Sequence, residues 1–180
     1  MDICIVAPPI TDFYSSPERT SGLGIRAVAA AVQREGYTCT IVDFSLEGKK
    51  TIPLPGHLQY LNEYIIPDEF GPCSFFSTYK RFGPQSSECV ARVTRLNPSA
   101  LLLSCFAFCY ADDTIEFAAS VKKNLPLLPI ILGGAGASVF PEYFLDTGAI
   151  DYLLEGEAES SIGPLLRELN RKNGDFSSVP

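Results

Sequence analysis

Few residues in this chain could do chemistry, and their spacing matches none of the common catalytic patterns. The single histidine is His57, and Cys105 and Cys109 form a CxxxC with no further cysteine nearby. There is no Walker lysine motif and no serine elbow, and APPITD follows the first predicted strand where a dinucleotide-binding domain needs GxGxxG. Hydrolysis, a bound NAD or FAD and a zinc-type site are therefore disfavoured. We expect no catalytic residue and no metal ligand within this chain.

A glycine-rich stretch, PIILGGAGAS at residues 129–138, is the best candidate for binding a ligand. Its apolar run ends at Gly133 and Gly134, and Gly136 follows before a helix predicted to begin at Ser138. Adjacent glycines remove the side chains that would keep a flat or bulky ligand away from the backbone. The same glycines also suit a tight turn between a strand and a helix. On this stretch alone both interpretations stay open.

Composition narrows the class of protein. A chain of 180 residues with 46% hydrophobic content suits one domain with a full core. A net charge of −7 disfavours nucleic acids and anionic membranes as partners, because both need a basic face. No apolar run reaches 18 residues and the N-terminus lacks signal-peptide features, so we expect a soluble, cytoplasmic protein without membrane contact. Cysteines within predicted strands, such as Cys4 and Cys39, are expected to be buried thiols without disulfides.

Short apolar strands alternate with amphipathic helices along most of the chain. This alternation is typical of an α/β domain with a doubly wound, five-stranded parallel sheet of the flavodoxin-like or Rossmann-like type. We expect the strand order 2-1-3-4-5. The strands are predicted at residues 2–7, 38–44, 99–106, 130–132 and 150–154. The helices are predicted at about residues 23–36, 85–96, 112–124 with Asp112 as its cap, 141–146 and 158–171.

An insertion at residues 45–87 interrupts this alternation. It is rich in proline, carries five phenylalanines or tyrosines between Phe70 and Phe82, and contains His57, which we expect at the surface. We expect it to be irregular apart from a short helix near residues 57–66. It is too long for an ordinary connection. A lid over the ligand edge, a surface that docks another domain and a satellite core without function all remain open.

In this strand order ligands bind outside the carboxyl ends of the strands, at the switch point between strands 1 and 3. A receiver domain that accepts a phosphate would need an aspartate where Ser104 and Cys105 end the third strand. FMN is disfavoured because Pro8 and Pro9 leave few backbone donors for its phosphate. The expected ligand-binding residues are Pro8, Pro9, Ile10, Ser104, Cys105, Phe106, Gly133, Gly134, Ala135, Gly136, Glu155 and Gly156. The acidic residues beside Gly156 suit a helix N-terminus equally well.

The order of these motifs resembles the N-terminal cobalamin-binding domain of B12-dependent radical S-adenosylmethionine enzymes. The most specific part is residues 130–159, where GG, PE, an aspartate before an apolar strand and GExE follow the family pattern. The resemblance implies that Ser104 and the pair Gly133-Gly134 line the slot for the nucleotide tail of cobalamin. An aromatic tail between sheet and helix needs glycine on one wall and a hydroxyl for a ring nitrogen.

Two departures from related patterns define the expected cofactor state. The loop after the first strand has no histidine, whereas the DxHxxG motif of methyltransferases and mutases ligates cobalt through one. We therefore expect base-off cobalamin with no lower axial histidine. The lower face of the corrin would then be occupied by water, by a side chain from residues 10–14, which lie nearest, or by nothing. The CxxxCxxC of the [4Fe-4S] cluster is also absent. S-adenosylmethionine and the cluster are thus expected in a barrel outside this chain.

The resemblance implies a cobalamin-binding domain over residues 1–175, with residues 176–180 beginning a linker to a radical S-adenosylmethionine barrel of the same polypeptide. The domain would present cobalamin, commonly as methylcobalamin, for methyl transfer to an unactivated carbon, although some members catalyse rearrangements. Two other classes share these motifs. One is a corrinoid sensor or carrier, and the other is a cofactor-free domain that docks a protein.

Overall fold

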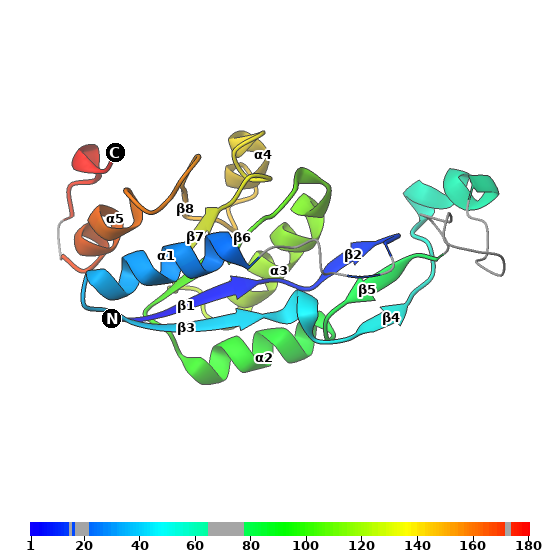
Figure 1. Cartoon of the computed structure of the whole chain (residues 1–180), viewed down its shortest axis with the longest axis horizontal. Coiled ribbons are helices and arrows are strands. Elements are labelled where there is room, and N and C mark those ends of the chain that lie inside the picture. The colour runs from blue at the N-terminus through cyan, green and yellow to red at the C-terminus, as the bar shows by residue number, and fades with distance from the viewer. Residues whose placement is uncertain (15, 17–21, 65–77, 172–173) are drawn as a thin grey trace.

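The computed structural model describes residues 1–14, 16, 22–64, 78–171 and 174–180. Its centre is a five-stranded parallel sheet in the order β3-β1-β6-β7-β8 (Figure 1). Counted along the chain, this is the predicted order 2-1-3-4-5, and the doubly wound α/β fold is confirmed. The strands are β1 (Asp2–Ala7), β3 (Thr38–Asp43), β6 (Ala100–Ser104), β7 (Ile130–Gly133) and β8 (Tyr152–Leu153).

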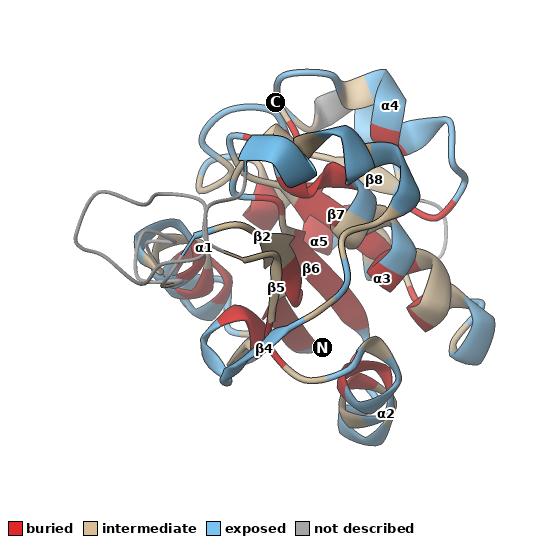
Figure 2. Ribbon diagram, turned by 90° about the vertical axis from the view of Figure 1, so that its right-hand side faces the viewer, coloured by how far each residue is buried: buried red, intermediate tan, exposed pale blue. Residues whose placement is uncertain are grey.

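Helices cover both faces of this sheet because its strands are apolar on both sides. In β1, Ile3 and Ile5 pack with α1 (Leu23–Arg34) and α5 (Ile162–Leu169). Cys4 and Val6 point to the other face, where α2 (Ser86–Leu96) and α3 (Ala111–Asn124) pack. Figure 2 shows the buried residues concentrated in the central strands and on the inner sides of the helices. The alternation of side chains along β1 thus assigns its buried residues to one or the other of two layers.

Three helix predictions differ from the structure. No helix begins at Ser138, which lies in consecutive turns, and α4 (Pro141–Leu145) begins instead at a proline, whose fixed φ suits a first helical position. The last helix occupies only Ile162–Leu169, because turns precede it. Asp112 is not the cap of α3: the N-cap residue is Tyr110, and the Asp112 carboxylate accepts a hydrogen bond from the Tyr143 hydroxyl at 2.6 Å.

In its described residues the insertion contains two short strands besides 3-10 turns, so the prediction of irregular structure was wrong there. A second, antiparallel sheet in the order β2-β5-β4 joins it to the segment after Pro9. Figure 1 shows this sheet beyond the carboxyl ends of β1 and β3. Phe82 of this sheet is buried against Ile10 and Tyr110. The strands are β2 (Ile10–Asp12), β4 (Lys49–Thr51) and β5 (Lys80–Phe82), with the 3-10 helices Phe44–Leu46 and Gly56–Tyr64 beside them.

Part of the aromatic insertion lies outside the described residues, including Phe70, Phe75 and Phe76. At the other end of the chain, the Phe176 ring packs 5.3 Å from the Tyr152 ring. Two further 3-10 helices are Phe108–Tyr110 and Phe176–Ser178. Within the described ranges, no helix combines the length and the hydropathy that crossing a membrane requires.

Candidate functional site

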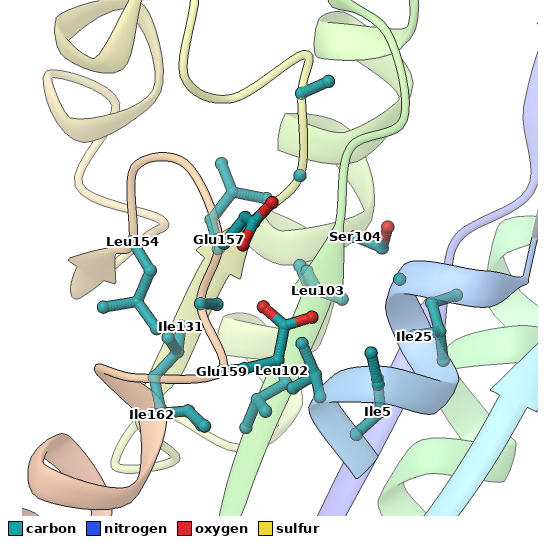
Figure 3. Close-up of a pocket in the computed structure, with 18 of the residues that line it drawn as sticks. Ile5, Ile25, Leu102, Leu103, Ser104, Ile131, Leu154, Glu157, Glu159 and Ile162 are labelled. Carbon is teal, nitrogen blue, oxygen red and sulfur yellow. The ribbon is translucent and has the colours of Figure 1, made fainter. Parts of the chain in front are cut away.

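A cavity of about 550 Å³ lies on the α1/α5 face of the main sheet, where β6 and β7 end (Figure 3). Strand residues form its floor, α1 forms one wall, and the segment from Leu154 to Ile162 forms the other. Most of the side chains that line it are apolar. The floor includes Ile5, Leu102 and Ile131; Leu23, Ile25 and Val28 come from α1, and Leu154 and Ile162 from the opposite wall.

Strand alternation explains why Ser104 and Gly133 face this cavity. Leu102 and Ile131 point to the α1/α5 face, so Ser104 and Gly133, each two residues further along, share that face. The parallel register pairs Ser104 directly with Gly133. The hydroxyl of Ser104 therefore lies beside a position that has no side chain, at the open end of an apolar floor.

Among the described residues, the polar side chains that line the cavity are those of Ser104, Glu157 and Glu159. Figure 3 shows the Glu159 carboxylate among the labelled apolar side chains, Glu157 beyond them, and Ser104 on the side nearer α1. None of the three has a hydrogen-bond or ion-pair partner among the described residues, and no lysine, arginine or histidine of that part of the chain lines the cavity. The loop that carries the glutamates is held by a hydrogen bond from the Gly156 amide to Ser138 Oγ at 3.0 Å.

The three glycines at the end of β7 and in the turn that follows, Gly133, Gly134 and Gly136, differ in the space around them. A Cβ at Gly133 would meet only the Leu154 carbonyl oxygen, at 3.8 Å. A Cβ at Gly134, whose φ is +105°, would lie 2.5 Å from the Cys105 carbonyl oxygen, and one at Gly136 would lie 2.4 Å from the Ala107 carbonyl carbon. Gly134 and Gly136 therefore permit close packing of two backbones. Of the three glycines, Gly133 alone leaves free space for a ligand.

The other expected site residues are spread over neighbouring places. Gly134, Ala135 and Gly156 line the main cavity together with Ser104 and Gly133. Pro8, Ile10 and Phe106 line a hollow of about 30 Å³ at the switch point, which also touches Ser104 and Ile25. Pro9, Cys105, Gly136 and Glu155 lie on neither cavity.

The cysteine of this group is part of the core. Cys105 is buried, its thiol donates a hydrogen bond to the Ala107 carbonyl oxygen at 3.3 Å, and burial raises its pKa to about 11. It is therefore a neutral thiol at physiological pH, whereas Cys109 is exposed.

Sequence reasoning missed the cavity wall formed by α1 and the contribution of Glu159. The helix was predicted at residues 23–36, but not as a wall of the ligand cavity. Glu159 belongs to the GExE motif of residues 156–159. Its direction into the cavity had no signal in the sequence, because that direction depends on how the loop after β8 returns over the sheet.

A second cavity, of about 500 Å³, lies between the insertion and α3, and its lining includes His57, Asp112 and Asp113. Thr11, one of the residues expected near the lower face of the corrin, is hydrogen-bonded to protein groups at this cavity. The Thr11 amide donates to Asp113 Oδ2 at 2.7 Å, and the Tyr79 hydroxyl donates to Thr11 Oγ1 at 2.6 Å. Burial raises the pKa of Asp113 to about 6, although the hydrogen bonds from Thr11 oppose the rise.

Asp113 is expected to make stability depend on pH between about 4 and 6. Its pKa in the folded chain lies above the usual value, so its protonation favours folding, and that contribution is lost as the pH rises through about 6. Asp113→Asn keeps an acceptor for Thr11 and removes the charge, so we expect it to stabilise the fold at pH 8 by about 1 kcal/mol. Denaturant unfolding at pH 4 and pH 8 measures both effects.

The control is Glu155→Gln, which removes the same charge from an exposed position away from α3. The stability difference between Asp113→Asn and the parent chain should shrink at pH 4, whereas Glu155→Gln should change stability little at either pH. If Asp113→Asn changed the free energy of unfolding by the same amount at pH 4 and pH 8, the raised pKa of Asp113 would be contradicted.

Comparisons with known proteins find similarity to a methyltransferase in sequence and to a response regulator in fold. No family model matches the chain. It is 24% identical over 175 residues to cytidylyl-2-hydroxyethylphosphonate methyltransferase from Streptomyces wedmorensis. The matched region covers 96% of this chain and 29% of that protein. The chain thus spans less than a third of this relative.

Among solved structures, the chain is similar to the RcsB response regulator from Salmonella typhimurium, with a TM-score of 0.55, 10% identity, and coverage of 97% of this chain and 62% of that one. The receiver domain of the histidine kinase PA1611 from Pseudomonas aeruginosa gives a TM-score of 0.46, 15% identity and 94% coverage of both chains. The RcsB likeness is one of fold, and in this chain β6 ends on Ser104, not on an aspartate.

Proposed function

We propose that this chain is a cobalamin-binding module of a methyl-transferring enzyme, and that its main cavity takes the nucleotide tail. The pairing of Ser104 with Gly133 on the floor of an apolar cavity is the observation that carries the proposal. The similarity to a methyltransferase supports methyl transfer as the reaction class. Methyl transfer to an unactivated carbon would further require a radical S-adenosylmethionine barrel with its [4Fe-4S] cluster elsewhere in the polypeptide.

The residues of the cavity fit an aromatic heterocycle. Ile5, Leu102 and Ile131 offer it a flat apolar floor, and the missing side chain of Gly133 leaves space above the strand end. The Ser104 hydroxyl has no partner among the described residues, so it is available to a ring nitrogen. When bound, cobalamin supplies a cobalt centre that can carry a methyl group.

The surroundings support a base-off state without a lower histidine. The sole histidine of the chain, His57, is exposed on the 3-10 helix Gly56–Tyr64 and lines the second cavity, not the main one. Ile10 is buried, and Asp12 accepts a hydrogen bond from the Tyr110 hydroxyl. In this chain the residues bind and orient the cofactor and exclude water from its tail, and none acts as acid, base or nucleophile.

The proposal is tested by the absorption spectrum of the purified chain after incubation with hydroxocobalamin and removal of free ligand. We expect a retained corrinoid with a base-off band that His57→Ala leaves unchanged. Because the cavity holds the tail, cobinamide, which lacks the nucleotide tail, should bind at least about tenfold more weakly, a difference of about 1.4 kcal/mol. Equal affinity for the two corrinoids, or no binding of either, would contradict the proposal.

A protein-docking module is the second candidate, because aromatic side chains are exposed beside the carboxyl edge of the sheet. Phe140 and Phe106 are 54% and 44% exposed, and Phe140 packs edge-on against Phe108 at 4.9 Å. Exposed aromatic groups of this kind mark interaction surfaces. A chain that binds no corrinoid but loses a partner on Phe140→Ala would favour this function.

A further inference from the structure

The main cavity combines an apolar lining with two carboxylates that no described residue pairs. Glu159 is half-buried and Glu157 is exposed, and both point into the space above the strand floor (Figure 3). Positive side chains are missing from the described lining. The described lining is therefore apolar and negative at the same time, which an apolar aromatic ring alone would not require.

A carboxylate accepts hydrogen bonds and donates none. A ligand that fills the cavity removes water from Glu159, and the lost hydrogen bonds must be replaced by donors or positive charge on the ligand. An aromatic base without an N–H leaves the carboxylate unpaired. A base that carries an amine satisfies it through a charge-assisted hydrogen bond, which is stronger than a neutral one.

A purely structural role for Glu159 is not supported by the contacts of α5. The helix begins at Ile162, and no side chain caps its N-terminus at Ser161. The Ile162 amide donates instead to the Ala158 carbonyl oxygen at 2.8 Å. Glu159 lies three residues before the helix and points to the cavity, not to the helix end.

We infer that Glu159 makes the cavity selective for cobamides whose tail base presents an N–H donor, such as a purine with an exocyclic amine, over the donor-free dimethylbenzimidazole of cobalamin. This inference rests on the proposed function. Ser104 can accept or donate and so accommodates either base, whereas Glu159 discriminates between them because it only accepts.

Binding measurements on the purified chain test this selectivity without any activity assay. Dissociation constants would be determined by absorption titration near pH 8 for an adenine-tailed cobamide, for cobalamin and for cobinamide. We expect the adenine-tailed cobamide to bind at least about tenfold more tightly than cobalamin. Glu159→Ala should reduce that preference to less than about threefold, with an unchanged melting temperature.

The matched control is Glu155→Ala, which removes the same charge from the same loop at an exposed position off the cavity. It should keep the preference. No preference in the parent chain, or a preference that Glu159→Ala leaves intact, would overturn the inference. If both tailed cobamides bind more tightly than cobinamide, the proposed function stands whatever the selectivity; if neither does, the proposed function itself fails.

Discussion

Replacing Gly134 with alanine is expected to lower the free energy of unfolding by about 3 kcal/mol. Two costs add at this position. The φ of +105° is one that L-residues rarely adopt, and the new Cβ would lie 2.5 Å from the Cys105 carbonyl oxygen. The nearest atoms belong to the backbone and cannot rotate away. Denaturant unfolding followed by circular dichroism measures the loss.

Gly133→Ala is the matched control for Gly134→Ala, because the two glycines are neighbours and the same methyl group is added. The Cβ at Gly133 meets only the Leu154 carbonyl oxygen, at an ordinary van der Waals distance of 3.8 Å. We expect this variant to stay within about 0.5 kcal/mol of the parent chain. Equal destabilisation by the two variants would show that the turn packs differently from the structure described here.

Gly133→Phe is expected to weaken cobalamin binding at least tenfold, about 1.4 kcal/mol, while leaving cobinamide binding unchanged. A side chain at Gly133 shares the face of Ile131 and stands beside Ser104, so a phenyl ring would occupy the space proposed for the tail base. The affinity should fall progressively from Gly133→Ala to Gly133→Leu to Gly133→Phe. Absorption titration measures each constant.

Cobinamide is the internal control for Gly133→Phe because it has no nucleotide tail. A parallel loss of cobinamide affinity would indicate a general disturbance of the carboxyl edge. Unchanged cobalamin affinity in a folded Gly133→Phe variant would place the tail outside this cavity and contradict the proposed function.

The main sheet could be predicted because its signals are local and repeated. DICIVA ends at Pro8 and Pro9, ALLLS lies between two helical segments, and parallel strands of this kind require crossover connections. The second sheet could not be predicted in this way. Its strands, such as KKT and KRF, have three residues each and no apolar alternation. They form because β5 pairs both with β4 and with β2, which lies about 70 positions earlier in the chain. Such pairing leaves no mark on local composition.

The glycine stretch shows the same division within one motif. Its composition indicated a turn that admits close approach, and both interpretations, a ligand surface and backbone packing, are consistent with the letters GGAG. In the structure the loop after β6 packs against Gly134 and Gly136, whereas the position of Gly133 faces open space. A contact between two backbones depends on the path of both chains, which neither segment specifies alone.

By itself, the sequence determined the strands and helices of the main sheet, their order along the chain, and the lack of histidine in the loop after the first strand. These follow from periodicity and composition, which act over a few residues. Tertiary structure alone decided that α1 and the segment after β8 enclose one cavity over Ser104 and Gly133, and that Glu159 enters it. The physical reason is that side-chain direction in a loop is set by what the loop packs against, and those contacts come from segments far apart in the chain.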